Sequence, residues 1–314
     1  MASWQDDATI VRNASLRELV RARRRQQIAF LIEARRLVEE APLRTHHAHG
    51  VVNSRASLGV TPDSNPFIAH LMAGFQACLP DYTLFEFELW FGSERPTPPH
   101  NDAVFYLKTG QTVALQFWVL IEACRMPISA DALKEAPSGK NALQCLVPAV
   151  PGVMFPGMSA VLTREGMVEY RADEVVGGDD MSIGDCLLFK NSVIHTAPGS
   201  TDTFRAALAF RAHLAGEDYS SDVDTLLWFR DELRRNEALE RRLVTTRNPY
   251  FQRVVDRLKS IPGDGPDLSR VCKVDRNDYA ALRKRLAEFD FGRPAQRAAL
   301  ASRPSDDRIT NPKE

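Results

Sequence analysis

The chain has 314 residues, 44% of them hydrophobic, which is enough for one sizeable core with helical additions. Its 40 basic and 41 acidic residues give a net charge of −1, which excludes the strongly basic surface of a nucleic-acid-binding protein. Five widely spaced cysteines, no signal-peptide pattern and no run of about 18 apolar residues predict a reduced, cytoplasmic protein without a membrane span.

The first 82 residues are predicted to be mainly helical. A helix is expected over residues 15–40, where Ser15 and Glu18 have the spacing of a capping box and apolar residues recur at helical intervals. The apolar spacing of residues 66–79 predicts a second, shorter helix.

Three histidines, His46, His47 and His49, lie between these two helices. A histidine-rich tract is one way to bind a metal, but no carboxylate or thiol stands near it in the sequence. The alternatives are a loop that faces a substrate and a plain surface loop, and we favour the surface loop.

The period-two alternation of residues 83–91 predicts a half-buried strand. A proline-rich turn over residues 96–99 follows and stiffens the approach to His100 and Asp102, which we expect at the end of the strand. In an extended backbone, residues two apart project to the same side, so the two side chains can reach one metal ion.

Residues 113–122 are the next predicted strand, with Gln116 and Trp118 on one face. Gln116 could donate a hydrogen bond to a carboxylate beside Trp118, and a tryptophan packed in the core explains the pattern equally well. The proline- and glycine-rich residues 123–160 are interpreted as an irregular lid and substrate wall.

A strand over residues 167–175, an acidic turn over residues 177–180 and a tight turn at Gly184-Asp185 are expected next. Beyond this turn, Leu187 and Phe189 are predicted to pack inward while the chain runs on to His195.

Residues 203–213 then read as an apolar strand that carries Arg205 and Arg211. Because the two arginines are six residues apart, a regular strand points both to the same face. A buried arginine needs an anion, and a dicarboxylate co-substrate is one way to supply it.

The pattern changes after residue 214. Residues 222–242, 248–260 and 275–289 are predicted to be amphipathic helices that cover the sheet, with a dimer interface or closure over a substrate as the alternatives. The polar residues 293–314 are predicted to form a flexible tail.

The residues with the clearest chemical implication are His100, Asp102 and His195. Two imidazoles and one carboxylate are the ligand set of a facial triad, which binds Fe(II) on one face and leaves the other face open for a co-substrate and O₂.

The order of these features resembles the phytanoyl-CoA dioxygenase-like branch of the Fe(II)/2-oxoglutarate oxygenases over residues 84–214. The features are the His-x-Asp pair, the strand with Trp118, the Gly-Asp turn, the distal His195 and the arginine about ten residues later. The resemblance implies a mainly β fold with added helices, in which a double-stranded β-helix (jelly-roll, cupin-like) core is flanked by N- and C-terminal α-helices.

The resemblance also implies roles for individual residues. Fe(II) is expected to bind His100, Asp102 and His195, and the distal carboxylate of 2-oxoglutarate is expected to pair with Arg205. The resemblance places Trp118 and Asn101 at the co-substrate as well, and Gln116 is expected beside them because it shares a strand face with Trp118. The family spacing favours Arg205 over Arg211, which is left to bind substrate or to cap the outer end of its strand.

Taken together, we expect one oxygenase domain over residues 1–314. Its parts are an N-terminal helical region (1–82), the β-helix core (83–214), C-terminal helices (215–292) that could join copies into a homo-oligomer, and the tail (293–314).

The expected reaction is hydroxylation, desaturation or cyclisation at a C–H bond of a small organic molecule, such as a specialised metabolite, with release of succinate and CO₂. The alternatives are a jelly-roll metal-dependent isomerase or hydrolase that uses no 2-oxoglutarate, and a non-catalytic scaffold. The isomerase or hydrolase has no need of a buried arginine behind the distal histidine, and a scaffold would be indicated by the loss of a metal ligand, whereas all three ligands are present.

Overall fold

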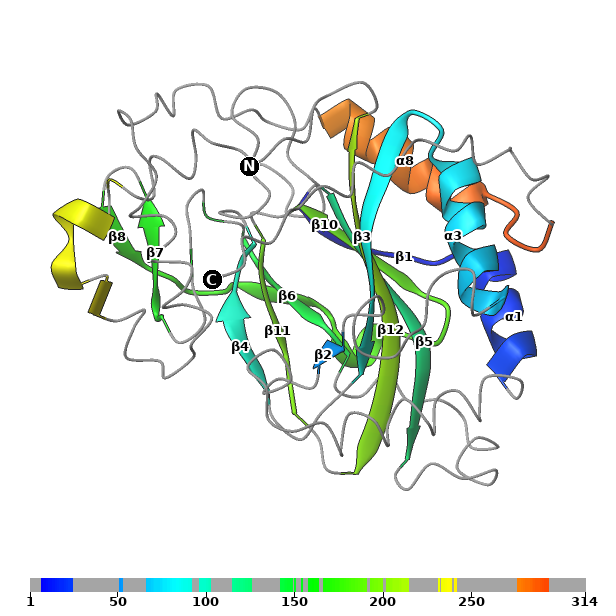
Figure 1. Cartoon of the computed structure of the whole chain (residues 1–314), viewed down its shortest axis with the longest axis horizontal. Helices are drawn as coiled ribbons and strands as arrows, with labels where there is room; N and C mark the ends of the chain where they lie inside the picture. Colours follow the sequence, from blue (N-terminus) through cyan, green and yellow to red (C-terminus); the bar gives the residue numbers. More distant parts are fainter. Residues whose placement is uncertain are drawn as a thin grey trace, which may run out of the picture.

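The computed structural model describes residues 7–24, 51–52, 66–91, 96–102, 115–125, 142–148, 150, 154, 158–163, 166–190, 193–199, 202–214, 231, 233–238, 240–241 and 276–293. Two antiparallel sheets lie face to face, and helices cover the outer face of the larger sheet (Figure 1).

The large sheet has six strands and the small sheet has four. In spatial order, the large sheet consists of β1 (Ala8–Val11), β10 (Cys186–Lys190), β5 (Leu115–Arg125), β12 (Thr203–Leu214), β3 (Tyr82–Phe91) and β2 (Val51–Val52). The small sheet consists of β4 (Thr97–His100), β11 (Ile194–Ala197), β6 (Gln144–Val147) and β9 (Glu174–Gly177). A separate hairpin pairs β7 (Ala160–Thr163) with β8 (Gly166–Glu169).

The path of the chain between the two sheets defines the fold. From β3 to β12 the chain passes back and forth between the large sheet (β3, β5, β10, β12) and the small sheet (β4, β6, β9, β11), and all pairs are antiparallel. Eight strands wound in this way form a jelly roll. The predicted double-stranded β-helix is therefore confirmed.

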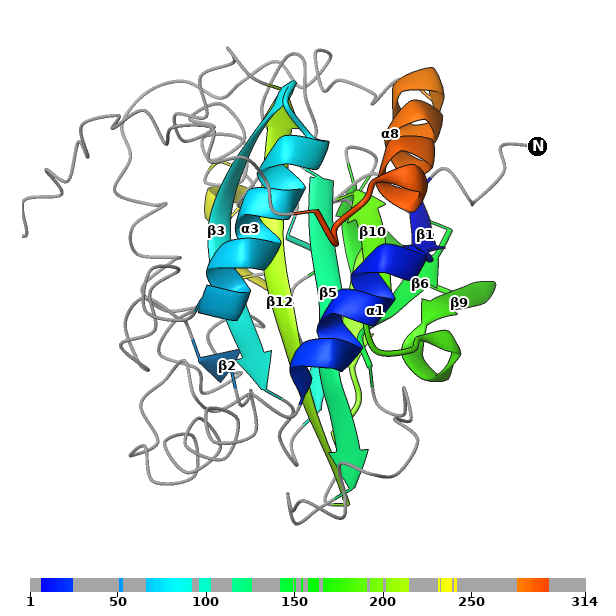
Figure 2. The ribbon, with the colours of Figure 1, turned by 90° about the vertical axis from the view of Figure 1, so that its right-hand side faces the viewer.

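Three helices lie side by side across the outer face of the large sheet (Figure 2): α1 (Ala14–Arg23), α3 (Pro66–Cys78) and α8 (Arg276–Glu288). Their buried side chains share one apolar cluster with every second residue of β5 and β12, in which Phe117 and Phe210 stack at 4.6 Å between ring centroids. For α8, the prediction that a C-terminal helix covers the sheet is confirmed. No helix in the described part of the chain combines the length and the apolarity needed to span a bilayer.

A second apolar cluster fills the space between the two sheets. It contains Trp118, Leu187 and Phe189 from the large sheet and Cys145 and Val176 from the small one. The predicted inward packing of Leu187 and Phe189 is thus confirmed.

Gly184 makes the predicted turn before β10 possible. It has a φ of 85°, and a Cβ at this position would lie 2.5 Å from Cα of Arg17. The next residue, Asp185, accepts hydrogen bonds from the backbone N–H of Ser182 and from Nε of Arg17, so α1 is tied to the turn that leads to His195.

Several predictions about local structure are wrong. The proline-rich residues 97–99, expected in a turn, belong to β4, which can contain prolines because it is an edge strand. The expected irregular segment 123–160 includes the end of β5 and all of β6. Residues 167–175, expected as one strand, are divided between β8 and β9 by the non-strand residues 170–173, where the chain leaves the hairpin and joins the small sheet.

The N-terminal region also differs from the prediction. Strand β1, which was not predicted, pairs with β10 at the edge of the large sheet. The cap of α1 is Asn13, whose side chain accepts a hydrogen bond from the backbone N–H of Leu16, and Ser15 lies inside the helix. The helix α1 ends at Arg23, and residues 25–40 of the predicted helix lie outside the described residues.

Candidate metal centre

The fold brings His100, Asp102 and His195 together. His100 is the last residue of β4 and His195 lies in β11, where the antiparallel register places the two residues opposite each other. Asp102 follows β4 by two residues. One ligand atom from each of the three side chains lies within 4.8 Å of the others.

Both imidazoles are oriented by their own backbone. Nδ1 of His100 lies 2.9 Å from the carbonyl oxygen of Pro98, and Nδ1 of His195 lies 3.2 Å from that of Val193. A hydrogen bond from Nδ1–H to a carbonyl leaves Nε2 with a free lone pair, which is how a metal-ligating histidine is usually held. Nε2 of His100 lies 3.6 Å from Oδ1 of Asp102, within the separation of about 4 Å that ligand bonds of about 2 Å allow.

The protonation states also suit a metal. Burial, followed by the nearby charge of His100, lowers the pKa of His195 to about 4, so its imidazole is neutral at pH 7. Burial raises the pKa of Asp102, but its electrostatic interactions with His195, His100 and Arg211 lower it by more, so the carboxylate stays ionised. A neutral imidazole and an ionised carboxylate are the forms that bind a metal.

The second oxygen of Asp102 has a different partner from the first. The Nη2 atom of Arg211 on β12 donates to Oδ2 of Asp102 at 3.3 Å, and the Arg211 side chain is 7% exposed. On the neighbouring strand β5, Gln116 lies directly opposite Arg211. Gln116 is buried, and its Nε2 has no hydrogen-bond partner among the residues described.

Arg205 lies on the same face of β12 as Arg211, as predicted from their spacing. The even-numbered residues from Phe204 to Ala212 pack under the helices, so the odd-numbered arginines face the small sheet.

Nη1 of Arg205 donates to the carbonyl oxygen of Pro198 at 2.7 Å. Pro198 lies three residues after His195, about 10 Å along an extended chain. Arg205 is buried, and burial lowers its pKa to about 10, so it remains a cation between the sheets at pH 7.

Trp118 lies on the inner face of β5, two residues after Gln116 along the strand. Its register partners are Ala209 on β12 and Leu187 on β10, and its side chain is buried in the cluster between the sheets. The structure therefore places Trp118 along the way from the triad to Arg205.

Asn101, between two of the triad residues, is buried against Met154. Its backbone N–H donates to the carbonyl oxygen of Met154 at 3.0 Å, and its Oδ1 accepts from the backbone N–H of Met154 at 3.0 Å. Its carboxamide oxygen is thus used within the protein, although the sequence suggested a contact with a co-substrate.

Some neighbours of the triad were not predicted. The ring of Phe189 lies 5.2 Å from that of His195, and Cys145 is the register partner of His195 on β6. Cys145 belongs to a strand that was read as irregular, so no signal placed it there. His46, His47 and His49 lie outside the described residues.

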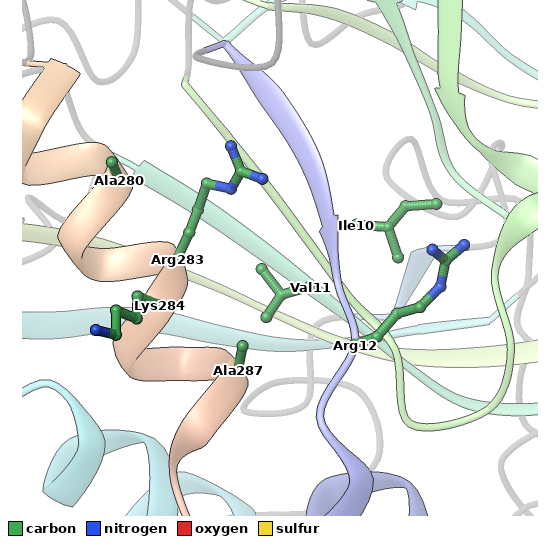
Figure 3. A pocket seen from close by; sticks show the side chains of 7 residues that line it. All are labelled: Ile10, Val11, Arg12, Ala280, Arg283, Lys284 and Ala287. Carbon is green, nitrogen blue, oxygen red and sulfur yellow. The ribbon is translucent and has the colours of Figure 1, made fainter.

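A groove of about 300 Å³ lies away from the triad, between β1 and α8 on the helix side of the large sheet (Figure 3). Its lining side chains are cationic or apolar, with no histidine, cysteine or carboxylate among them. The lining residues are Ile10, Val11, Arg12, Ala280, Arg283, Lys284 and Ala287.

No protein-family model and no curated protein matches the sequence. Solved structures to which the chain is similar include the epimerase SnoN in complex with Fe³⁺, α-ketoglutarate and nogalamycin RO, which is 18% identical with a TM-score of 0.39 over 84% of this chain and 97% of that chain. The apo form of the non-haem monooxygenase ThoJ is 16% identical, with a TM-score of 0.42 over 81% and 97%. HygX from Streptomyces hygroscopicus, with nickel and 2-oxoglutarate bound, is 12% identical, with a TM-score of 0.35 over 67% and 83%.

Proposed function

We propose that this chain is an Fe(II)- and 2-oxoglutarate-dependent dioxygenase that oxidises a C–H bond of a small organic molecule. The observation that carries the proposal is the cluster of His100, Asp102 and His195 in the interior of a jelly roll, with their ligand atoms within 4.8 Å of one another. Two imidazoles and a carboxylate on one side of a metal leave its other side open. Iron in such a site, with 2-oxoglutarate and O₂, supplies the oxidising power and yields succinate and CO₂.

In this proposal the chain holds the metal through Nε2 of His100, Nε2 of His195 and Oδ1 of Asp102. The carbonyl oxygens of Pro98 and Val193 fix the two imidazole rings, so little ordering remains to be done when the metal binds.

Arg205 is the proposed anchor of 2-oxoglutarate. Its contact with Pro198, three residues after His195, and its fixed charge suit the distal carboxylate of a molecule whose other end chelates the metal. Trp118 is the proposed wall beside the co-substrate, because it lies on the inner face between these two points.

The rival function is a metal-dependent isomerase or hydrolase without 2-oxoglutarate. It would use the same three ligands but has no need of a buried cation behind the distal histidine. A non-catalytic scaffold would need neither the ligands nor the cation. Arg205 therefore favours the oxygenase.

We further infer that the protein is a single cytoplasmic domain with its catalytic core over residues 83–214. Four buried cysteines, Cys78, Cys124, Cys145 and Cys186, carry free thiols, which suits a reducing compartment. The proposed substrate is a specialised metabolite. Association of copies through the C-terminal helices stays a prediction, and α8 would have to use its charged side, because Tyr279, Leu282 and Leu286 pack against the sheet.

The test is anaerobic addition of Fe(II) and then 2-oxoglutarate to the purified protein. A keto acid chelated to Fe(II) gives a weak visible charge-transfer band, which we expect in the wild type. The band should be absent in His195→Ala, and Arg205→Ala should need at least about tenfold more 2-oxoglutarate to produce it, because a charge-assisted anchor is lost. If iron binds the wild type without this band, the isomerase or hydrolase is the better account.

A further inference from the structure

We propose that Arg211 is a positioning residue that restricts Asp102 to one metal-binding oxygen and thereby preserves an open position on the metal. The inference rests on the proposed function and concerns a residue for which sequence reasoning suggested only substrate binding or a strand cap.

The two oxygens of Asp102 face different partners. Oδ1 lies 3.6 Å from Nε2 of His100, on the side where the other ligands meet. Oδ2 lies 3.3 Å from Nη2 of Arg211, which donates a hydrogen bond to it. The side chains of Asp102 and Arg211 are 13% and 7% exposed, so bulk water does not replace this contact.

The backbone of Arg211 is held on both sides. In β12 its register partners are Gln116 of β5 and Phe85 of β3, so it belongs to an interior strand of the large sheet. Its guanidinium keeps its charge at any physiological pH and cannot accept a hydrogen bond. Arg211 can therefore hold Oδ2 only as a donor, and rotation of the carboxylate towards the metal would break a buried, charge-assisted hydrogen bond.

This restriction matters because a carboxylate can bind a metal through one oxygen or through both. With one oxygen from Asp102, a facial triad leaves three positions of an octahedral ion open. The keto acid end of 2-oxoglutarate takes two of them, which leaves one. If Asp102 used both oxygens, chelation by 2-oxoglutarate would fill the last open position or displace an oxygen of the carboxylate.

The experiment uses Co(II) as an air-stable substitute for Fe(II) in the full chain, and compares the wild type with Arg211→Met and Arg211→Gln. The glutamine variant keeps an N–H donor without the charge. The matched control is Arg205→Met, which removes the other buried arginine from the same face of β12. Infrared difference spectra of metal-loaded minus metal-free protein, with ¹³C-labelled aspartate, report the splitting of the carboxylate stretches, which is smaller when both oxygens bind. Titrations give the affinities for Co(II) and for 2-oxoglutarate.

We expect the wild type to show the wide splitting of a single bound oxygen and Arg211→Met to show the narrow splitting of two. Arg211→Met should also bind 2-oxoglutarate roughly tenfold more weakly, the scale of effects from residues that orient metal ligands. Its affinity for Co(II) should not fall, because a cation beside the metal is removed and a ligand oxygen is gained. Arg211→Gln should keep the wide splitting, and Arg205→Met should weaken 2-oxoglutarate without altering the splitting.

An unchanged splitting in Arg211→Met would overturn the inference, and a loss of 2-oxoglutarate affinity without that change would assign Arg211 to direct contact with the co-substrate. A lower Co(II) affinity in Arg211→Met would also overturn the inference, because it would show that Arg211 holds Asp102 in place as a ligand and does not restrict it to one oxygen. If the wild type binds no Co(II), the proposed function fails together with the inference. If the wild type binds both Co(II) and 2-oxoglutarate while Arg211→Met behaves identically, the inference alone fails.

Discussion

At the scale of single residues, His195 is held neutral by its surroundings. It is 6% exposed and flanked by the ring of Phe189, and burial lowers its pKa by more than the hydrogen bond to the carbonyl oxygen of Val193 raises it. The side chain is therefore prepared to give Nε2 to a metal without first losing a proton.

Substitution of His195 should abolish tight metal binding. We expect His195→Gln to lower the affinity for Co(II) by at least about a hundredfold, because one of the three ligands is lost. The matched control is His70→Gln, since Nε2 of His70 contacts the carbonyl oxygen of Phe291, away from the triad. Metal content after equilibrium dialysis measures both, and equal losses in the two variants would contradict the assignment of the triad.

The same histidine predicts a pH dependence of stability for the metal-free protein. The pKa of His195 is about 4 in the folded chain and near 6.5 in an unfolded one, so the unfolded chain takes up the proton first as the pH falls. Above pH 6.5, His195 is neutral in both the folded and the unfolded chain. As the pH falls from 6.5 to about 4, protonation of the unfolded chain lowers the free energy of unfolding by roughly 3 kcal/mol.

Urea unfolding in the presence of a chelator at pH 7 and pH 5 measures this effect. We expect the wild type to lose stability between these two values and His195→Gln to lose clearly less. A variant with the same pH dependence as the wild type would show that other groups account for it.

The metal ligands could be predicted from the sequence, but one of their contacts could not. The His-x-Asp pair and the distal histidine were recognisable because ligand chemistry limits which residue types and spacings can form a triad. The contact between Arg211 and Asp102 was not, because it depends on the register of β12 against β5 and on the path of the chain after β4, which no local pattern encodes.

At the scale of elements, Asn13 joins two helices that are far apart in the sequence. Its Oδ1 caps the start of α1 through the backbone N–H of Leu16. Its Nδ2 donates to the carbonyl oxygens at the end of α8, at 2.7 to 3.2 Å: those of Leu286, Ala287 and Phe289. One buried side chain thus satisfies unpaired groups at both helix ends.

Removal of this side chain should destabilise the fold. We expect Asn13→Ala to cost about 2 kcal/mol in the free energy of unfolding, from the lost cap and the unsatisfied carbonyls. Asn13→Asp keeps the acceptor for Leu16 but places a carboxylate against the end of α8, so it should also be destabilising. Unfolding curves of the full chain measure the free energy of unfolding of both variants. An Asn13→Asp variant as stable as the wild type would show that the hydrogen bonds to α8 contribute nothing.

A β-bulge on β5 turns Glu122 towards the helices. Ala206 and Ala207 of β12 pair with Glu122 and Leu120, so the chain of β5 has one extra residue there. As a result, Leu120 points between the sheets while Glu122 reaches Arg24, next to the end of α1, and forms a buried ion pair at 2.7 Å.

Breaking this pair from either side should be costly. We expect Glu122→Leu or Arg24→Leu alone to lower the free energy of unfolding by about 3 kcal/mol, because the remaining charge is left buried without its partner. The double variant should recover much of this loss. Glu237→Ala serves as the control, since it breaks an exposed pair with Arg241 and should cost less than about 0.5 kcal/mol. Additive losses in the double variant would contradict the pairing.

Elements with a strong period were predictable, and short ones were not. The helix at residues 66–79 and the strands at residues 83–91 and 203–213 were recognised because the apolar residues of each recur with one regular period in the sequence. Strands β1 and β6 have four residues each, which is too few to show a periodic pattern that distinguishes a strand from a loop. Only pairing with β10, and with β9 and β11, makes them strands.

At the scale of the whole molecule, the two apolar clusters differ in the size of their side chains and in their place in the fold. The cluster under the helices contains large side chains, such as Phe75, Phe117 and Phe210, and supports the large sheet from outside. Between the sheets, β12 contributes the small side chains of Ala207 and Ala209, which lie between Arg205 and Arg211. The sequence shows this asymmetry as an alternation along residues 203–213, which predicted the strand and the shared face of its two arginines, whereas the jelly roll was predicted from the family resemblance.

The most direct test of the central claim is anomalous diffraction at the iron edge from crystals grown anaerobically with Fe(II) and 2-oxoglutarate. We predict one anomalous peak bound by Nε2 of His100, Oδ1 of Asp102 and Nε2 of His195, with 2-oxoglutarate extending from it to the guanidinium of Arg205. A peak at any other group of side chains, or iron at the triad with 2-oxoglutarate directed away from Arg205, would contradict the account.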